Sequence, residues 1–518
     1  QGGQLVVNGQ IRRNVASTSG TLKYTQSGGT VIINGNAAIN TRAKLEVLNA
    51  GSIFNMLGAS TLTIVRGGGG ASSGDLYLRP ASSSITGGNI IFTQIPVVGP
   101  VVDAVQSYLL EANIPLNNLT ITGKTAATAR NATIGLMVSP LTINGTLTLS
   151  NANSILASNN NNITIKNGFS NSGTYNYGTN TTTFSGGVQT IVGASVTNFY
   201  DLMVSPVTSL TPNNSFTVNR NLTINSGILA LTNRKLTLIG NLVNNGSYTD
   251  DNITGGISLS GAVQQQITGI GAYGRLELNN NAGARLNNSI SLQNNLDLTL
   301  GILNINQYEL SLGQSSIING APFSITKMIV SDGVATSEGL RKFFGVIAAP
   351  TSFTFPVGVS GKYTPAQFTI NTNATVGSIN VIPINNNHPA VDDPLNVLDY
   401  YWQIESSGIS NFDGKIVLEY NSGDVKVTGI NTEADYVAAE LLNPGTYWSK
   451  ANPGPLTDNV DETLHQITFN YLAGTNNVSG DYTAGTNPAL PDEVPSYKSN
   501  KNGDWSDETI WDAIGASP

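Results

Sequence analysis

The sequence has no cysteine, only two histidines and few charged residues among its 518 positions. Without cysteine, disulfides, thiolate metal sites and cysteine nucleophiles are all excluded. Charged side chains account for 11% of the chain, whereas they make up about a quarter of typical domains. Asn, Thr, Ser and Gly take their places. We therefore expect a polar but mostly neutral surface, as in a bacterial extracellular protein or a simplified repeat protein.

Clustered positive charge and long apolar runs are also missing. The net charge is −8 and the isoelectric point lies near 4.9, while basic pairs such as Arg12-Arg13 and Arg341-Lys342 are isolated and expected to be solvated. Because binding to phosphates needs clustered Lys and Arg, nucleic acid is not an expected partner. The most apolar stretch, 95–116, contains two acidic residues and three prolines, so we expect no membrane insertion.

What the sequence has instead is a repeated phrase of alternating apolar and polar residues. It occurs as LTINGTLTLS from Leu141, LTINSGILALTN from Leu222 and LDLTLGILNIN from Leu296. Alternation of this kind, interrupted by Gly or Asn, predicts short half-buried strands joined by turns. The copies start 222 − 141 = 81 and 296 − 222 = 74 residues apart, whereas one coil of a solenoid takes roughly 20 to 30 residues. Each copy therefore predicts three or four coils of a right-handed parallel β-helix, which we assign to residues 1–335.

One segment departs from this alternation. In 100–113 (PVVDAVQSYLLEAN) apolar residues recur at helical spacing, and Pro100 suits the first turn of a helix. We predict a short helix near 100–113 that packs on the flank of the β-helix.

From residue 336 the strands become longer and more aromatic. Segments such as SFTFPVG, VLDYYWQIES and HQITFNYL combine buried aromatic positions with charged outer ones. That pattern is typical of two packed antiparallel sheets, so 336–486 is predicted to be an Ig-like β-sandwich. Residues 487–518 contain a proline-rich stretch followed by NGDWSDETIW, which predicts a linker and the start of a further module. We expect the natural protein to continue beyond Pro518.

Several phrases carry a resemblance to a known group of proteins. The coils of the form GxLxLxN, the strands SFTFPVGVSGKYTPAQFTI, WQIESSGIS and IVLEY, and the closing NGDWSDETIW resemble the giant cell-surface proteins of Bacteroidetes that the type IX secretion system exports. The resemblance covers most of the chain. It implies a repetitive surface or secreted adhesin, in some cases serving gliding motility, with a C-terminal export and anchoring domain. This sequence does not include such a domain, so we expect a fragment of a larger protein.

We predict a non-enzymatic extracellular structural or adhesive rod that is part of a large bacterial cell-surface adhesin or stalk. Its expected partners are other segments of the same protein, the secretion machinery, and surface glycans or polysaccharides. Two alternatives stay open. One is a polysaccharide-degrading β-helix enzyme, which fold analogy alone suggests. The other is a subunit of a self-assembling extracellular filament, suggested by stackable coils.

An enzyme of this kind needs paired carboxylates on one face. Between Leu141 and Asp332 the acidic residues are few, and only Asp250 and Asp251 are adjacent. Neighbours on a strand point to opposite faces, so we predict no catalytic residue and no cofactor. We expect Asp250 and Asp251 to form a turn, and we keep calcium as the functional alternative, although calcium takes roughly six to eight oxygen ligands.

The remaining candidates are the histidines and the glycine run. Asp392 and Asp393 follow His388 in NNNHPAVDD, which is a second candidate for a metal-binding loop, although we expect a plain surface loop. His465 is expected at an exposed strand position. The glycine run 67–70 lacks the GK[ST] ending of a phosphate loop and is interpreted as an ordinary loop.

Four tyrosines recur near glycines in corresponding coils, Tyr175, Tyr177, Tyr248 and Tyr273. Exposed tyrosines would bind sugar rings by stacking. Their repetition beside turns favours packing instead.

Overall fold

The computed structural model describes residues 2–13, 20–36, 41–68, 74–126, 128–442, 447–450, 459–491, 496–499 and 511–514. Over these residues the protein is all-β, as predicted, with three short 3-10 turns and no α-helix. It divides into two compact units, Gln1–Gly301 and Ile302–Pro518. The sequence-based boundaries after 335 and 486 stay predictions. No helix in the described ranges is long and apolar enough to cross a membrane.

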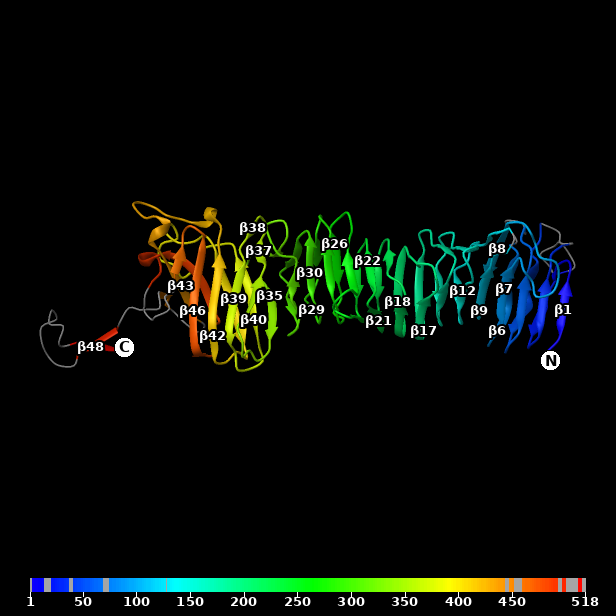
Figure 1. Ribbon diagram of the computed structural model, residues 1–518, viewed down its shortest axis with the longest axis horizontal. Helices are drawn as coiled ribbons and strands as arrows, with labels where there is room; N and C mark the ends of the chain where they lie inside the picture. Colours follow the sequence, from blue (N-terminus) through cyan, green and yellow to red (C-terminus); the bar gives the residue numbers. More distant parts are fainter. Residues whose placement is uncertain are drawn as a thin grey trace. The chain divides into compact units, whose positions relative to one another are not determined.

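Parallel pairing organises the first unit, whose strands follow one another in sequence order (Figure 1). Leu202 is the register partner of Leu222, Leu222 of Leu242, and Leu242 of Ile267. The partners are 222 − 202 = 20, 242 − 222 = 20 and 267 − 242 = 25 residues apart, within the length predicted for one coil. Such pairing between successive coils is compatible with the predicted β-helix.

Hydrogen bonding between strands groups those of the first unit into three sheets, and one further strand lies outside them. The first group is β1 (Gln4–Val7), β3 (Thr30–Ile33), β5 (Thr61–Ile64), β7 (Asn89–Thr93), β9 (Asn118–Thr122), β11 (Leu141–Ile143), β12 (Leu147–Leu149), β14 (Ile163–Ile165), β15 (Phe169–Asn171), β17 (Thr181–Val192), β18 (Asp201–Pro212), β20 (Leu222–Ile224), β21 (Ile228–Thr232), β23 (Leu242–Asn244), β24 (Ser247–Asp250), β26 (Gln265–Thr268) and β28 (Ala284–Leu286). The second is β2 (Lys23–Gln26), β4 (Leu45–Met56), β6 (Leu76–Ile85), β8 (Gln106–Ala112), β10 (Ala132–Leu136), β13 (Ser154–Ala157) and β16 (Thr174–Asn176). The third is β19 (Phe216–Val218), β22 (Lys235–Leu238), β25 (Gly256–Leu259), β27 (Leu276–Asn279) and β30 (Leu296–Leu300), and the further strand is β29 (Ile290–Leu292).

The core of the first unit is built from every second residue of these strands. In β20, Leu222 and Ile224 are fully buried while Thr223 between them is half-buried. Because register partners stack, each inward leucine packs against the inward residue of the next coil. Burying one such side chain stabilises the fold by roughly 1.5–3 kcal/mol, so the stability of the unit grows with the number of stacked coils.

The predicted helix near 100–113 is absent, and that prediction was wrong. Gln106–Ala112 forms β8, which pairs in parallel with β6 on one side and β10 on the other. Tyr108 and Leu110 are buried between these neighbours. A short apolar run satisfies both helical and strand spacing, and here pairing with two adjacent coils decides in favour of the strand.

The second unit combines parallel and antiparallel pairing. Its strands are β31 (Leu303–Asn306), β32 (Leu310–Leu312), β33 (Ile318–Asn319), β34 (Ile329–Ser331), β35 (Leu340–Phe344), β36 (Thr351–Phe355), β37 (Val357–Val359), β38 (Lys362–Tyr363), β39 (Ala366–Thr372), β40 (Gly377–Ile384), β41 (Tyr401–Ser407), β42 (Phe412–Glu419), β43 (Tyr436–Leu442), β44 (Ser449–Lys450), β45 (Asn459–Asp461), β46 (Gln466–Thr475), β47 (Gly480–Thr486), β48 (Ser496–Ser499) and β49 (Trp511–Ile514). The 3-10 turns are η1 (Ser422–Asp424), η2 (Glu433–Asp435) and η3 (Asn487–Ala489). Strands β31, β34 and β37 pair in parallel, and antiparallel pairing begins where β35 meets β40.

Two antiparallel sheets follow. One is the antiparallel part, β35-β40-β41-β47-β43-β44, of a sheet in which β32 pairs with β35 in parallel, and the other has the order β36-β39-β42-β46-β45. Phe469 of β46 and Tyr482 of β47 are in ring contact, with centroids 4.9 Å apart, so the two sheets share buried aromatic side chains. Trp402 is fully buried, and its indole N–H donates to the carbonyl of Thr364 at 3.0 Å. Residues 502–510, which hold most of the NGDWSDETIW phrase, lie outside the described residues.

Candidate functional sites

Two carboxylates stand side by side on neighbouring strands of the first unit. Glu277 of β27 is the register partner of Asp297 of β30, between leucines that point inward. Sequence analysis missed this pair because 297 − 277 = 20 residues, one coil, separate the two acids. Superposing LELN (276–279) on LDLT (296–299) would have placed both acids at the same position of successive coils.

Each carboxylate of the pair faces its own cation. Lys235 Nζ contacts Glu277 Oε2, and Arg275 Nη2 lies 2.6 Å from Asp297 Oδ2. Burial raises the pKa of Glu277, but hydrogen bonds from Lys235 and Ser258 outweigh it and hold the pKa below its usual value. A general acid at neutral pH needs a raised pKa. Both acids thus take part in ion pairs with cations of the same unit.

Asp250 organises the end of β24. Its Oδ1 accepts hydrogen bonds from the backbone N–H of Asn252 at 2.8 Å and from the side-chain amide of Asn294 at 2.7 Å. Its Oδ2 accepts from the backbone N–H of Arg275 at 2.6 Å. The carboxylate thus ties the turn to two later coils.

Asp251 closes the same turn. Its Oδ1 accepts from the backbone N–H groups of Ile253, Thr254 and Gly255 at 3.0, 2.9 and 2.8 Å. These bonds, that of Gly255 first, hold the pKa of Asp251 well below its usual range. The expected turn is present, and its acceptor atoms already face N–H donors, which would repel a cation.

The second metal candidate is also a turn. Asp393 Oδ1 accepts from the backbone N–H of Leu395 at 3.0 Å, and Oδ2 accepts from the Asn396 amide at 2.7 Å. The backbone N–H of Asp392 donates to the carbonyl of Ala489. Throughout the part of the chain that the structure describes, no group of three or more acidic or histidine side chains is placed to hold a metal ion. Calcium at either aspartate pair stays a prediction.

The loop around His388 lies at the surface, as predicted, but the His388 side chain itself is buried. It is 7% exposed, and its ring packs against Trp448 with centroids 4.9 Å apart. Nδ1 accepts the backbone N–H of Ala390 at 3.0 Å, so the ring proton sits on Nε2 and is donated to Asp481 Oδ2 at 3.0 Å. Apolar neighbours that are distant in sequence bury the ring, which local sequence does not reveal.

His465 was predicted at an exposed strand position, and that prediction was wrong. His465 occupies a turn before β46, with φ of 52°, and its Nδ1 lies 2.9 Å from Glu433 Oε1. The alternating sequence around it resembles a strand, but the chain reverses there between β45 and β46.

The tyrosine prediction is confirmed for three of the four residues. Tyr175, Tyr248 and Tyr273 are buried at 8%, 1% and 0% exposure, while Tyr177 is half-buried. The rings of Tyr175, Tyr248 and Tyr273 fill the interior beside turns and are not available for stacking on sugars.

The basic pairs are only partly solvated, because one member of each is buried. Arg13 donates from Nε to Glu46 Oε1 at 2.9 Å. Lys342 is 3% exposed and donates from Nζ to the carbonyls of Gly313, Gln314 and Phe343 at 2.7, 2.7 and 2.8 Å. Arg341 and Lys342 are neighbours in β35, where successive residues face opposite sides, so Lys342 points inward while Arg341 points outward.

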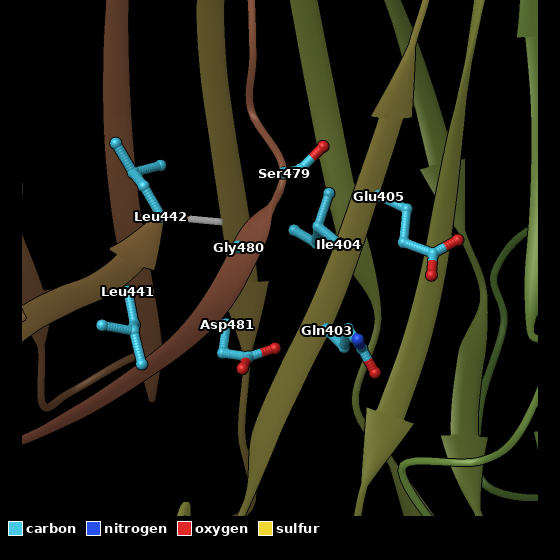
Figure 2. A pocket seen from close by; sticks show the side chains of 8 residues that line it. All are labelled: Gln403, Ile404, Glu405, Leu441, Leu442, Ser479, Gly480 and Asp481. Atoms are coloured by element: carbon cyan, nitrogen blue, oxygen red, sulfur yellow. The ribbon is translucent and has the colours of Figure 1, made fainter. Parts of the chain in front are cut away.

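A hollow of about 480 Å³ lies over β41, β47 and the end of β43 in the second unit (Figure 2). Its lining residues are Gln403, Ile404, Glu405, Leu441, Leu442, Ser479, Gly480 and Asp481. Gln403 and Asp481 are register partners, and Asp481 is oriented by His388. Glu405 accepts from the amide of Asn380 at 3.2 Å. The hollow presents fixed carboxylate, amide and hydroxyl groups beside two leucines.

Comparisons of the chain with protein-family models, with curated proteins and with solved structures found no match.

Proposed function

We propose that the chain is a non-enzymatic extracellular rod segment, structural or adhesive, of a large bacterial cell-surface protein. The observation that supports this best is the run of register-paired, buried residues Leu202, Leu222, Leu242 and Ile267 on successive coils. A stack of this kind extends by adding coils and transmits load through main-chain hydrogen bonds. It is suited to holding other modules at a distance.

The proposal includes a right-handed parallel β-helix joined to an antiparallel β-sandwich. The parallel register of successive coils supports the first part. Ring contacts between the two antiparallel sheets support the second, both Phe469 with Tyr482 and Phe344 of β35 with Phe353 of β36, whose centroids are 6.0 Å apart. Aromatic side chains shared by two sheets are typical of a sandwich core.

The structural use of the acidic residues supports a non-enzymatic role. Asp201 pairs with Arg220, Glu277 with Lys235 and Asp297 with Arg275. Asp250 and Asp251 hold a turn. A polysaccharide-degrading enzyme would need one carboxyl group with a raised pKa, whereas hydrogen bonds hold the pKa of Glu277 below its usual value.

The proposed location is the surface of a Bacteroidetes cell, reached through the type IX secretion system, with a role in adhesion or gliding. The resemblance of the sequence phrases supports this. Its partners are other segments of the same surface protein, the secretion machinery, and glycans. The hollow beside Gln403 and Asp481 offers oriented hydroxyl-binding groups, so we place glycan contact there.

Protease treatment of intact source cells tests the location. An antibody against residues 128–301 is expected to lose its signal on intact cells while a cytoplasmic marker persists. Protection of the chain until lysis would refute a surface protein. In parallel, the purified chain is incubated with pectins, alginates and host glycans, and release of oligosaccharides would favour the enzyme. Glycan binding that Gln403→Ala weakens would support adhesion through the hollow.

A further inference from the structure

A lysine and an aspartate are buried against each other near the start of the first unit. Lys44 and Asp75 are 1% and 0% exposed at the side chain, and Nζ lies 4.0 Å from Asp75 Oδ1. The two residues precede register partners, Leu45 of β4 and Leu76 of β6, so they sit on adjacent coils. Local sequence predicts a solvated lysine here, because it precedes the inward Leu45 on an alternating strand.

The backbone fixes both residues in this relation. The N–H of Lys44 donates to the carbonyl of Asp75 at 2.8 Å, and the N–H of Asp75 donates to the carbonyl of Leu109 at 2.6 Å. Gly35 covers the lysine stem so closely that an added Cβ would lie 3.2 Å from Cδ and Cε of Lys44. The amine and the carboxyl group are therefore held together without freedom to separate.

Burial favours the uncharged form of the Lys44 amine. Removing charges from water is costly, and transfer of one proton from ammonium to carboxylate neutralises both members of a pair. Burial lowers the pKa of Lys44, and the nearby Asp75 carboxylate opposes that shift only in part. Neutral amine and protonated carboxyl are the reactive forms for amide formation.

We infer that Lys44 and Asp75 are the site of an intramolecular isopeptide bond that joins two successive coils. The amine lone pair of Nζ attacks the Asp75 carboxyl carbon, a C–N bond forms, and the C–Oδ1 bond breaks. Oδ1 leaves with two protons as one molecule of water, so no oxidant or other reactant is needed. The backbone N–H of Leu109 donates to Oδ2 at 2.9 Å, where negative charge develops when the carbon becomes tetrahedral.

Two other Lys–Asp pairs of the same chain serve as controls. Lys124 Nζ lies closer to its partner, 2.7 Å from Asp103 Oδ1, but the Asp103 side chain is 56% exposed. Lys362 contacts the buried Asp424, yet Lys362 is 29% exposed and also donates to Asn385 at 2.6 Å. The exposure of Asp103 and the second acceptor of Lys362 distinguish these pairs from Lys44 and Asp75, so no cross-link is expected at either.

Intact mass measurement of the purified full chain after incubation at 37 °C and neutral pH tests the inference. The expected result is the loss of one water relative to the sequence mass, with tandem mass spectrometry of the digest locating the branched peptide at Lys44 and Asp75. A full sequence mass after prolonged incubation would overturn the inference. A cross-link found instead at Lys124–Asp103 or Lys362–Asp424 would also overturn the inference, since proximity rather than burial would then determine where the bond forms.

Variants separate the bond from an ordinary ion pair. Lys44→Arg replaces the amine by a guanidinium and is expected to abolish the mass loss, with circular dichroism confirming that the chain folds. Asp75→Asn is expected to form the cross-link at the same two positions, with loss of ammonia in place of water. An unlinked but folded Asp75→Asn chain would contradict an amine positioned for attack.

Discussion

The rings of Tyr248 and Tyr273 meet edge to face inside the first unit, with centroids 6.0 Å apart and planes inclined by 78°. The two tyrosines come from successive coils. The Tyr273 hydroxyl lies 3.0 and 2.9 Å from the carbonyl oxygens of Thr268 and Gly269, where β26 ends and the chain turns. The pair therefore joins core packing to the closing of a turn.

Tyr273→Phe should lower the free energy of unfolding by about 1 kcal/mol, because it removes the hydroxyl that hydrogen-bonds to the carbonyls of Thr268 and Gly269. Tyr273→Ala should cost about 3–5 kcal/mol, since it also removes the ring from the core. Urea unfolding followed by far-UV circular dichroism measures both. The half-buried Tyr177→Phe is the control and should change little. Equal effects of Tyr273→Phe and Tyr177→Phe would show that the buried hydroxyl is not structural.

Glu46 should contribute to acid sensitivity. Burial raises its pKa, but hydrogen bonds from Arg42 and Arg13 outweigh burial and hold the pKa below the ordinary value of 4.5. A carboxyl group whose pKa is lower in the folded state stabilises the fold above the unfolded value, and that stabilisation is lost as pH falls through the folded value.

Glu46→Gln should cost about 3 kcal/mol at pH 7, because it removes a buried carboxylate that forms ion pairs with Arg13 and Arg42. Stability of the variant should also depend less on pH below 4.5. Urea titrations from pH 7 to pH 3 measure both effects, and the exposed Glu462→Gln is the matched control. Parallel acid profiles of wild type and Glu46→Gln would contradict the assigned ion pairs.

Lys342 should make the second unit more stable at alkaline pH. Burial lowers its pKa from 10.5 to about 8. In the interval between these values the unfolded chain binds more protons than the folded one, so stability rises with pH by as much as roughly 3 kcal/mol. Below pH 8 the ammonium is charged in both states, and its burial cost is felt in full.

Tryptophan fluorescence isolates this effect, since all four tryptophans lie in the second unit. Lys342→Met should flatten the rise in stability between pH 8 and pH 10, whereas Lys415→Met on the exposed face of β42 should keep it. If stability still rises between pH 8 and pH 10 in Lys342→Met, another titratable group causes the rise.

Calcium should leave the melting temperature of the chain unchanged. The carboxylate oxygens of Asp250 and Asp251 already accept N–H hydrogen bonds, and those donors disfavour a cation. Binding at a hundredfold excess over the dissociation constant would add about 2.7 kcal/mol of stability, which calorimetry detects easily. A rise with calcium that Asp250→Asn abolishes would establish a metal site at this turn.

Sequence predicted those features that depend on local alternation. The strands beginning at Leu222 and Leu242 were predictable, because each is a short segment with inward and outward positions that Asn and Gly end at once. The strand at Gln106–Ala112 was not, since its apolar spacing fits two periods and only its neighbours decide.

Sites that depend on register were also beyond a local analysis. Glu277 and Asp297 become neighbours only once the coil length is known. His388 and Lys342 are buried by residues distant in sequence, so their surroundings follow from the tertiary structure alone.

The central claim is a scaffold of stacked parallel coils with an inward face and an outward face. Hydrogen exchange combined with urea unfolding of Leu222→Ala and Thr223→Ala tests it most directly. Leu222→Ala should cost about 2–5 kcal/mol and speed exchange in β18 and β23, the register neighbours of β20. Thr223→Ala should stay within about 0.5 kcal/mol of wild type. Equal losses for both variants, or exchange confined to β20, would contradict the stacked scaffold.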